Sequence, residues 1–151
     1  MTDAMSRFKQ PCAVHVFLIR ERRVLLLRRA NTGYEDGRFS VIAGHLDGGE
    51  QVIAAAIREA REEAGITLAP SAVRVVGVMH RRSNDERVDF FVTASAWWGQ
   101  ITNAEPEKCS ELTWYPLDAL PTNVIPYVRH ALDRYQQSEG ALWFDSYGWE
   151  A

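Results

Sequence analysis

Residues 44–66 read GHLDGGEQVIAAAIREAREEAGI, a glycine-rich loop that leads into a helix pattern. Apolar residues recur at i, i+4, i+7 and i+11 from Ile53 to Ala64, and Gly65 follows as the expected C-terminal stop. We therefore predict a helix over residues 50–64 with one apolar stripe against a core. The glycines before it permit positive φ and close approach of the backbone to an anion or a metal.

Three carboxylates, Glu59, Glu62 and Glu63, follow one side of this helix at spacing i, i+3 and i+4. At roughly 100° per residue they fall within an arc of about 100°, and the apolar stripe points well away from them. Like charges at this spacing repel by roughly 0.2–0.5 kcal/mol per pair, so something cationic should compensate. Carboxylate oxygens beside a glycine-rich loop suit Mg²⁺ or Mn²⁺, which also bind phosphate. The alternative is an ordinary solvated acidic face.

The composition is that of one globular domain over residues 1–151. Hydrophobic residues make up 46% and charged residues 25%, with a net charge of −3. This balance disfavours a disordered chain and a basic surface for nucleic-acid polymers. The cysteines, Cys12 and Cys109, lie far apart, which argues against a disulfide framework and favours a cytoplasmic location. We expect no membrane span and no signal peptide, because long apolar runs are absent from the sequence.

Strand and helix patterns alternate along the chain. Strands are predicted over residues 12–19, 24–27, 39–43, 73–79, 88–96 and 112–115. A polar turn is expected at 81–87 and a second amphipathic helix at 124–137. This interleaving predicts an α/β layered domain. The aromatic tail at 141–151 should dock on its own domain or on a partner subunit of a homodimer.

The stretch quoted first resembles the signature of the Nudix hydrolases. It has Gly44, five residues, Glu50, seven residues, and then REAREEAGI from Arg58 to Ile66. Just before it, Ile42 and Ala43 stand where Pro-Gly is usual, a departure that affects loop stiffness more than chemistry. The resemblance implies an α/β/α sandwich around a mixed sheet. It also implies cleavage of a diphosphate linked to another group, with Mg²⁺ or Mn²⁺ as cofactor.

The resemblance also implies roles for single residues. The metal ligands would be Glu59, Glu62, Glu63 and the backbone carbonyl of Gly44. Glu50 and Arg58 would hold the loop and orient the helix carboxylates. Members of the family differ over which glutamate is the general base, so that assignment stays open.

A second part of the chain looks like the nucleoside triphosphate diphosphatase branch of this family. It comprises residues 103–109 (NAEPEKC), 111–114 (ELTW) and 120–121 (LP), and residues 44–46 also fit. Glu105 would be a fourth carboxylate near the metal, with Glu107 and Glu111 as rivals and an ordinary loop glutamate as the alternative. The implied substrate contacts, each with a structural alternative, are Arg29, His45, Pro126, Tyr127 and Arg129.

A few other side chains call for an interpretation. Tyr34 and Phe39 are either stacking groups for a base or, respectively, a turn residue and a core residue. His15 and His80 lie in apolar strands and are expected to be core histidines with satisfied hydrogen bonds. Cys109 is expected to be structural, because no Cys-His pattern accompanies it.

The function expected from the sequence is a Mg²⁺-dependent pyrophosphohydrolase that converts a nucleoside triphosphate, a small-molecule partner, to its monophosphate and pyrophosphate. Two alternatives within enzymes are hydrolysis of a nucleotide sugar such as ADP-ribose and hydrolysis of a dinucleoside polyphosphate. A third alternative is a catalytically silent nucleotide-binding regulator. The complete set of helix glutamates argues against it, since a sensor need not retain all three.

Overall fold

The computed structural model describes residues 6–149. The expectations about a signal peptide and the aromatic tail extend to residues 1–5 and 150–151, which lie outside the described residues. The strands of the large sheet are β1 (Cys12–Arg20), β2 (Arg23–Arg29), β3 (Phe39–Ser40), β4 (Ile42–His45), β6 (Val73–Arg82), β7 (Glu86–Ala94), β9 (Cys109–Pro116) and β10 (Trp143–Tyr147). The remaining elements are α2 (Val52–Ala64), α3 (Pro126–Gln137), the 3₁₀ turn η1 (Pro70–Ala72) and the small pair β5 (Thr67–Leu68) and β8 (Trp97–Trp98).

The sheet is mixed. Its order is β10-β6-β7-β1-β2-β3, with β4 paired to β1 and β9 paired to β2. The pairs β1/β7 and β10/β6 are parallel, whereas β1/β4 and β2/β9 are antiparallel. Strands β1 and β2 form a hairpin, which turns through Glu21 and Arg22, both at positive φ. Such a pair of positive φ values suits a two-residue hairpin turn.

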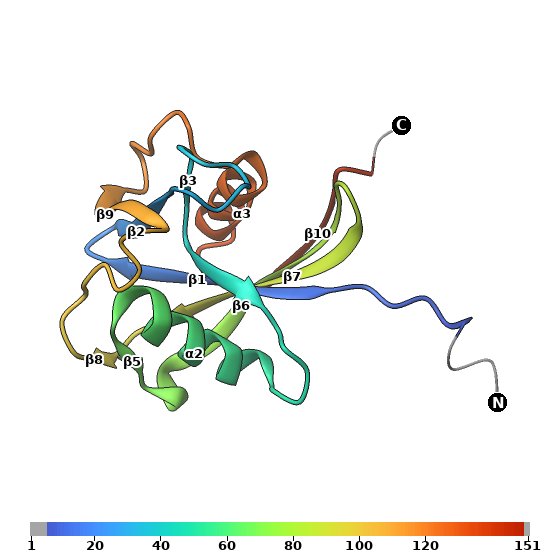
Figure 1. The fold of residues 1–151 in the computed structure, drawn as a ribbon, viewed down its shortest axis with the longest axis horizontal. Coiled ribbons are helices and arrows are strands. Elements are labelled where there is room, and N and C mark those ends of the chain that lie inside the picture. The colour runs from blue at the N-terminus through green and yellow to red at the C-terminus, as the bar shows by residue number, and fades with distance from the viewer. Residues whose placement is uncertain (1–5, 150–151) are drawn as a thin grey trace.

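Side chains that alternate along β1 build two cores. Val14, Val16 and Leu18 belong to the core under α2. Phe17 belongs to the core under α3, together with Leu26 of β2. Because successive strand residues point to opposite faces, the two helices cover opposite sides of the sheet, as Figure 1 shows. The predicted α/β/α sandwich with a mixed sheet is confirmed. No helix within residues 6–149 is long and apolar enough to cross a membrane.

Helix α2 ends where the sequence predicted, but its buried face is wider than the predicted stripe. Gly65 adopts φ 69° and its N–H donates to the Arg61 carbonyl at 3.1 Å. The buried residues of α2 are Ala55, Ala56, Glu59, Ala60 and Ala64. Ala60 and Ala64 of the predicted stripe are buried, and Ile53 and Ile57 pack against the same core. Burial extends beyond the stripe, however, so Glu59 does not lie clear of the core as expected. Small alanines bring the helix close to the sheet, and this approach draws Glu59 into the interface.

The turn predicted at 81–87 is shorter than expected. Strands β6 and β7 extend to Arg82 and from Glu86, which leaves residues 83–85 to reverse the chain. Arg81 thus lies inside a strand and is buried, not in an exposed turn. Its partner is the fully buried Asp89, whose carboxylate compensates the guanidinium charge. This ion pair lets a charged segment continue as buried strand.

The aromatic tail docks on its own domain, as one of the two predicted arrangements. Strand β10 pairs in parallel with β6, and Trp143 packs over Gly77, where a Cβ would overlap the indole. Further on, Trp149 donates from Nε1 to the His80 carbonyl at 2.8 Å. Within the described residues the buried Nε2 of His80 has no hydrogen-bond partner, so the expectation of a satisfied core histidine is not met.

Two neighbouring residues of β10 test this docking. Trp143 is 4% exposed and Phe144 is 61% exposed, because they point to opposite sides of the strand. Trp143→Ala should lower the free energy of unfolding by about 3–5 kcal/mol, as expected for a large aromatic lost from a core. Phe144→Ala, the matched control, should change it by less than about 1 kcal/mol. Urea denaturation measures both, and equal losses would contradict the docked tail.

Candidate functional site

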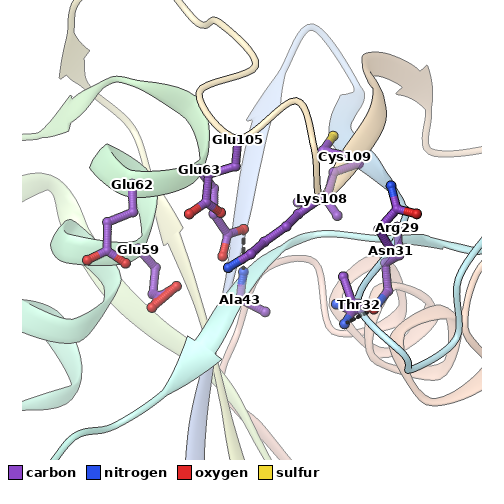
Figure 2. A pocket seen from close by; sticks show the side chains of 11 residues that line it. Arg29, Asn31, Thr32, Ala43, Glu59, Glu62, Glu63, Glu105, Lys108 and Cys109 are labelled. Atoms are coloured by element: carbon purple, nitrogen blue, oxygen red, sulfur yellow. Dashed lines mark hydrogen bonds between the residues drawn. The ribbon is translucent and has the colours of Figure 1, made fainter.

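A cavity of about 430 Å³ lies between α2, the end of β2 and the loop before β9. Its lining residues are Leu27, Arg29, Asn31, Thr32, Ala43, Glu59, Glu62, Glu63, Glu105, Lys108 and Cys109. Figure 2 shows the four carboxylates gathered on one side and Arg29 on the other, with Lys108 reaching between them. The structure thus brings Glu105 to the helix glutamates. We call this space the acidic cavity.

The close approach of α2 to β4 sets the position of two of these carboxylates. Gly44 lies directly against Glu59, and a Cβ at this position would overlap the carboxylate. The neighbouring Ala43 donates its N–H to Oε1 of Glu63 at 3.3 Å (Figure 2). Helix carboxylates and strand backbone therefore meet with no side chain between them, and Glu59 is only 7% exposed.

Burial and crowding raise the pKa of both carboxyl groups. The pKa of Glu63 stands well above its usual value, mainly because the group is buried, and its hydrogen bond to Glu59 and the charge of Glu59 add to the effect. Burial also raises the pKa of Glu59, although hydrogen bonds from Glu63 and Arg58 oppose the shift. Two such groups favour a proton or a cation between them.

Arg58 joins the glycine-rich loop to the helix. Its Nε and Nη2 donate to the two carboxylate oxygens of Glu50 at 3.2 and 2.7 Å, and Nη2 also donates to the His45 carbonyl at 3.1 Å. Its Nη1 donates to Oε1 of Glu59 at 2.6 Å and to Oε1 of Glu62 at 3.4 Å. The hydrogen bond from Arg58 lowers the pKa of Glu50. The structure therefore brings Glu50 and Arg58 together at the site.

The acidic cavity has the donor atoms that a divalent cation prefers, although they are not gathered around one point. As the side chains stand, no group of three or more His, Cys, Asp or Glu residues within 6–149 is arranged to hold a metal ion. Arg58 meanwhile occupies oxygens of Glu59 and Glu62. The donors nevertheless fit in kind, since four carboxylates line the cavity, and the missing Cβ of Gly44 leaves room for one of them, Glu59. Glu62 is 50% exposed and can turn inward without disturbing the core.

A second cavity of about 380 Å³ adjoins the first and shares Arg29 and Ala43 with it. Its other lining residues are Ala13, His15, Tyr34, Gly44, His45, Arg81, Ser83, Asn84, Arg87 and Tyr127. We call this space the basic cavity, because its charged lining side chains are arginines. Of the predicted substrate contacts, it contains Arg29, His45 and Tyr127.

Helix geometry separates the other two predicted contacts from Tyr127. Residues two positions apart on a helix point roughly 200° apart. Accordingly, Arg129 turns away and donates to the Pro121 carbonyl, while Pro126 is exposed at the helix start. Neither residue lines the acidic or the basic cavity. The structure thus keeps only Tyr127 of this group in reach of a ligand.

The sequence did not point to Arg81, which lines the basic cavity, or to the buried Asp89, which pairs with it. Arg81 Nε lies 2.6 Å from Oδ2 of Asp89, and the guanidinium carbon lies 3.6 Å from the centre of the Tyr127 ring. The signal was present in the spacing, because Arg81 follows the buried Met79 by two residues. The period of a strand puts both on the same face.

Three other residues have clear positions. Phe39 is buried and packs edge-on against Tyr115, whereas Tyr34 is half exposed and lines the basic cavity. The Cys109 thiol donates to the Glu111 carbonyl at 3.1 Å, and burial raises its pKa. A thiol held in this way is a poor nucleophile.

The chain is similar to known proteins over most of its length. The NUDIX domain model matches residues 9–135. The crystal structure of a MutT NUDIX hydrolase from Burkholderia pseudomallei is 27% identical over 83% of this chain and 98% of its own, with a TM-score of 0.76. A MutT protein from Methanosarcina mazei Go1 is 18% identical over 88% and 99%, with a TM-score of 0.74. An ADP-ribose pyrophosphatase from Streptococcus suis 89-1591 is 16% identical over 91% and 99%, with a TM-score of 0.62. The last two show a shared fold.

Two arginines of α2 offer a test of the ion-pair network. Arg58→Ala leaves Glu50 and Glu59 without their charged donor, so the free energy of unfolding should fall by about 1–3 kcal/mol. Arg61 is exposed on the same helix, and Arg61→Ala should cost less than about 1 kcal/mol. Urea denaturation of both variants measures the difference. Indistinguishable stabilities would show that Arg58 is ordinary surface charge.

Proposed function

Since the chain belongs to the Nudix hydrolase family, acting on the diphosphate linkages of nucleotides, we propose that it converts nucleoside triphosphates to monophosphates and pyrophosphate in the cytoplasm. The observation that carries the proposal is the pairing of four carboxylates with Arg29 and Lys108 around one cavity. Carboxylates suit a divalent cation, and the two cationic side chains suit phosphate oxygens. The cofactor we propose is Mg²⁺, with Mn²⁺ as a substitute.

The chain's own residues divide the work at the acidic cavity. Glu59, Glu62, Glu63 and Glu105 would hold the cation, and Arg58 keeps the first two oriented through the contacts described above. Arg29 and Lys108 bind the phosphate oxygens that face the other side. A divalent cation, when bound, neutralises charge on the diphosphate and favours loss of a proton from the attacking water.

The bond changes balance as a hydrolysis. The oxygen of a water molecule forms a bond to one phosphorus of the α–β linkage while the P–O bond from that phosphorus to the bridging oxygen breaks, which gives the monophosphate and pyrophosphate. One carboxylate accepts the proton that the water loses. Glu59 and Glu105 are two candidates for this base, because each borders the cavity that would take the diphosphate. Whichever of them accepts the proton leaves the cation to the remaining carboxylates.

Substitutions in the acidic cavity test the cofactor assignment. Glu62→Gln and Glu63→Gln keep the side-chain shape but remove an anionic ligand, so kcat should fall by about 10²-fold or more with folding retained. Chelation of divalent cations should abolish turnover. Glu107→Gln is the control, since Glu107 is exposed in the same loop as Glu105 but lines neither cavity. Turnover within about tenfold of the unchanged protein in both cavity variants would contradict the cation site.

Product analysis tests the substrate class. The protein is incubated with Mg²⁺ and, separately, nucleoside triphosphates, ADP-ribose and a dinucleoside polyphosphate, and the products are resolved by chromatography. The proposal expects the highest kcat/KM for a triphosphate, with pyrophosphate released. Release of ribose phosphate from ADP-ribose as the faster reaction would overturn it, as would hydrolysis of none of these compounds.

A further inference from the structure

The basic cavity contains a buried guanidinium with a free edge. Arg81 is 4% exposed and lines this cavity. Its Nε and Nη2 face the Asp89 carboxylate at 2.6 and 3.4 Å, whereas Nη1 has no hydrogen-bond partner among the described residues. Nη1 is also not one of the fully buried polar atoms that lack a hydrogen-bond partner, so it retains some exposure to solvent. A buried charged donor thus remains available to a ligand.

The surroundings hold Arg81 in place. Asp89 is fully buried on the neighbouring strand β7, and the Tyr127 ring lies under the guanidinium plane. The Tyr127 hydroxyl is in turn hydrogen-bonded to Nε2 of the buried His15 at 3.0 Å. A donor fixed by an ion pair and an aromatic face binds an acceptor on a ligand with little loss of conformational freedom.

The charges around this donor favour an acceptor on the ligand. Neither Asp nor Glu occurs among the described residues that line the basic cavity, whereas Arg29 and Arg87 do. Arg87 is paired with the exposed Asp85 at 2.9 Å, and Arg29 supports the loop through the Tyr34 carbonyl at 2.7 Å. A guanidinium can only donate, so a second donor placed against Nη1 would leave both groups unsatisfied.

The position of the basic cavity links it to the diphosphate site. It shares Arg29 and Ala43 with the acidic cavity, so a nucleotide whose phosphates face the carboxylates can place its base here. Guanine and hypoxanthine carry a carbonyl oxygen at the position where adenine carries an amino group. Uracil and thymine differ from cytosine in the same way.

We infer that Arg81 is a specificity-determining residue, which donates from Nη1 to a carbonyl oxygen of the base and so selects oxo-bearing over amino-bearing nucleotides. This inference rests on the proposed function, because it assumes a nucleotide across the two cavities. A charge-assisted hydrogen bond of this kind corresponds to a preference of about 10–100-fold.

Binding of two matched pairs of monophosphates tests the inference without turnover. Inosine and adenosine monophosphate differ in the oxo or amino group and the accompanying ring proton, and so do uridine and cytidine monophosphate. Calorimetry with Mg²⁺ present should give a Kd at least about tenfold lower for the oxo member of each pair. The same preference should appear in kcat/KM for the corresponding triphosphates.

The variants distinguish a loss of base preference from a loss of folding. Arg81→Gln alone leaves a buried carboxylate unpaired, so Arg81→Gln is combined with Asp89→Asn, and circular dichroism checks the fold. The double variant should bind both members of a pair equally. Arg82→Gln is the control, because Arg82 is the exposed neighbour on β6, and it should keep the preference.

Equal binding by the unchanged protein, binding of no monophosphate, a preference for amino bases, or a preference that survives in the folded double variant would overturn the role of Arg81. If the double variant does not fold, Arg81→Lys, which keeps the charge but loses the planar donor edge, should weaken the preference. An undiminished preference would overturn the inference. Absence of triphosphate hydrolysis would overturn the proposed function, while the binding data still judge Arg81.

Discussion

The structure depends on keeping like-charged carboxylates together where a helix meets a sheet. Glu59 and Glu63 of α2 lie against the backbone of β4, and burial raises the pKa of both. Gly44 makes this approach geometrically feasible, because any Cβ there would overlap Glu59. Arg58 supplies the local positive charge and ties the helix to the loop through Glu50. A divalent cation is the chemical complement of the negative charge that remains.

Periodicity and stop signals accounted for most of the fold. The helix stop at Gly65 and the α/β layering follow from local patterns, whereas the mixed sheet was implied by the resemblance, and the structure has all three. The full width of the buried face of α2 did not follow, because Ala55 and Ala56 carry a weaker hydrophobic signal than Ile53 and Ile57. A helical-wheel plot of α2 cannot reveal that Gly44, which lies on strand β4, leaves room for the Glu59 carboxylate.

Long-range pairing explains the remaining differences. Arg81 was expected in a turn because its sequence neighbours are charged, and only the facing strand shows that Asp89 neutralises it. The parallel pairing of β10 with β6 joins residues more than sixty positions apart, which no short pattern specifies. In the candidate site, the signature residues gather as their spacing suggested. The predicted substrate contacts depend on the rotation of α3, which separates Tyr127 from Arg129.

Direct titration of Mn²⁺, followed by the paramagnetic resonance signal of the free ion, tests the central claim that the carboxylates at Gly44 form a cation site. The unchanged protein should remove Mn²⁺ from solution. Glu63→Gln, which removes an anionic ligand, and Gly44→Ala, whose Cβ displaces Glu59, should each weaken binding by about tenfold or more. Mn²⁺ affinity that is equal in all three folded proteins, or absent from the unchanged protein, would contradict the account.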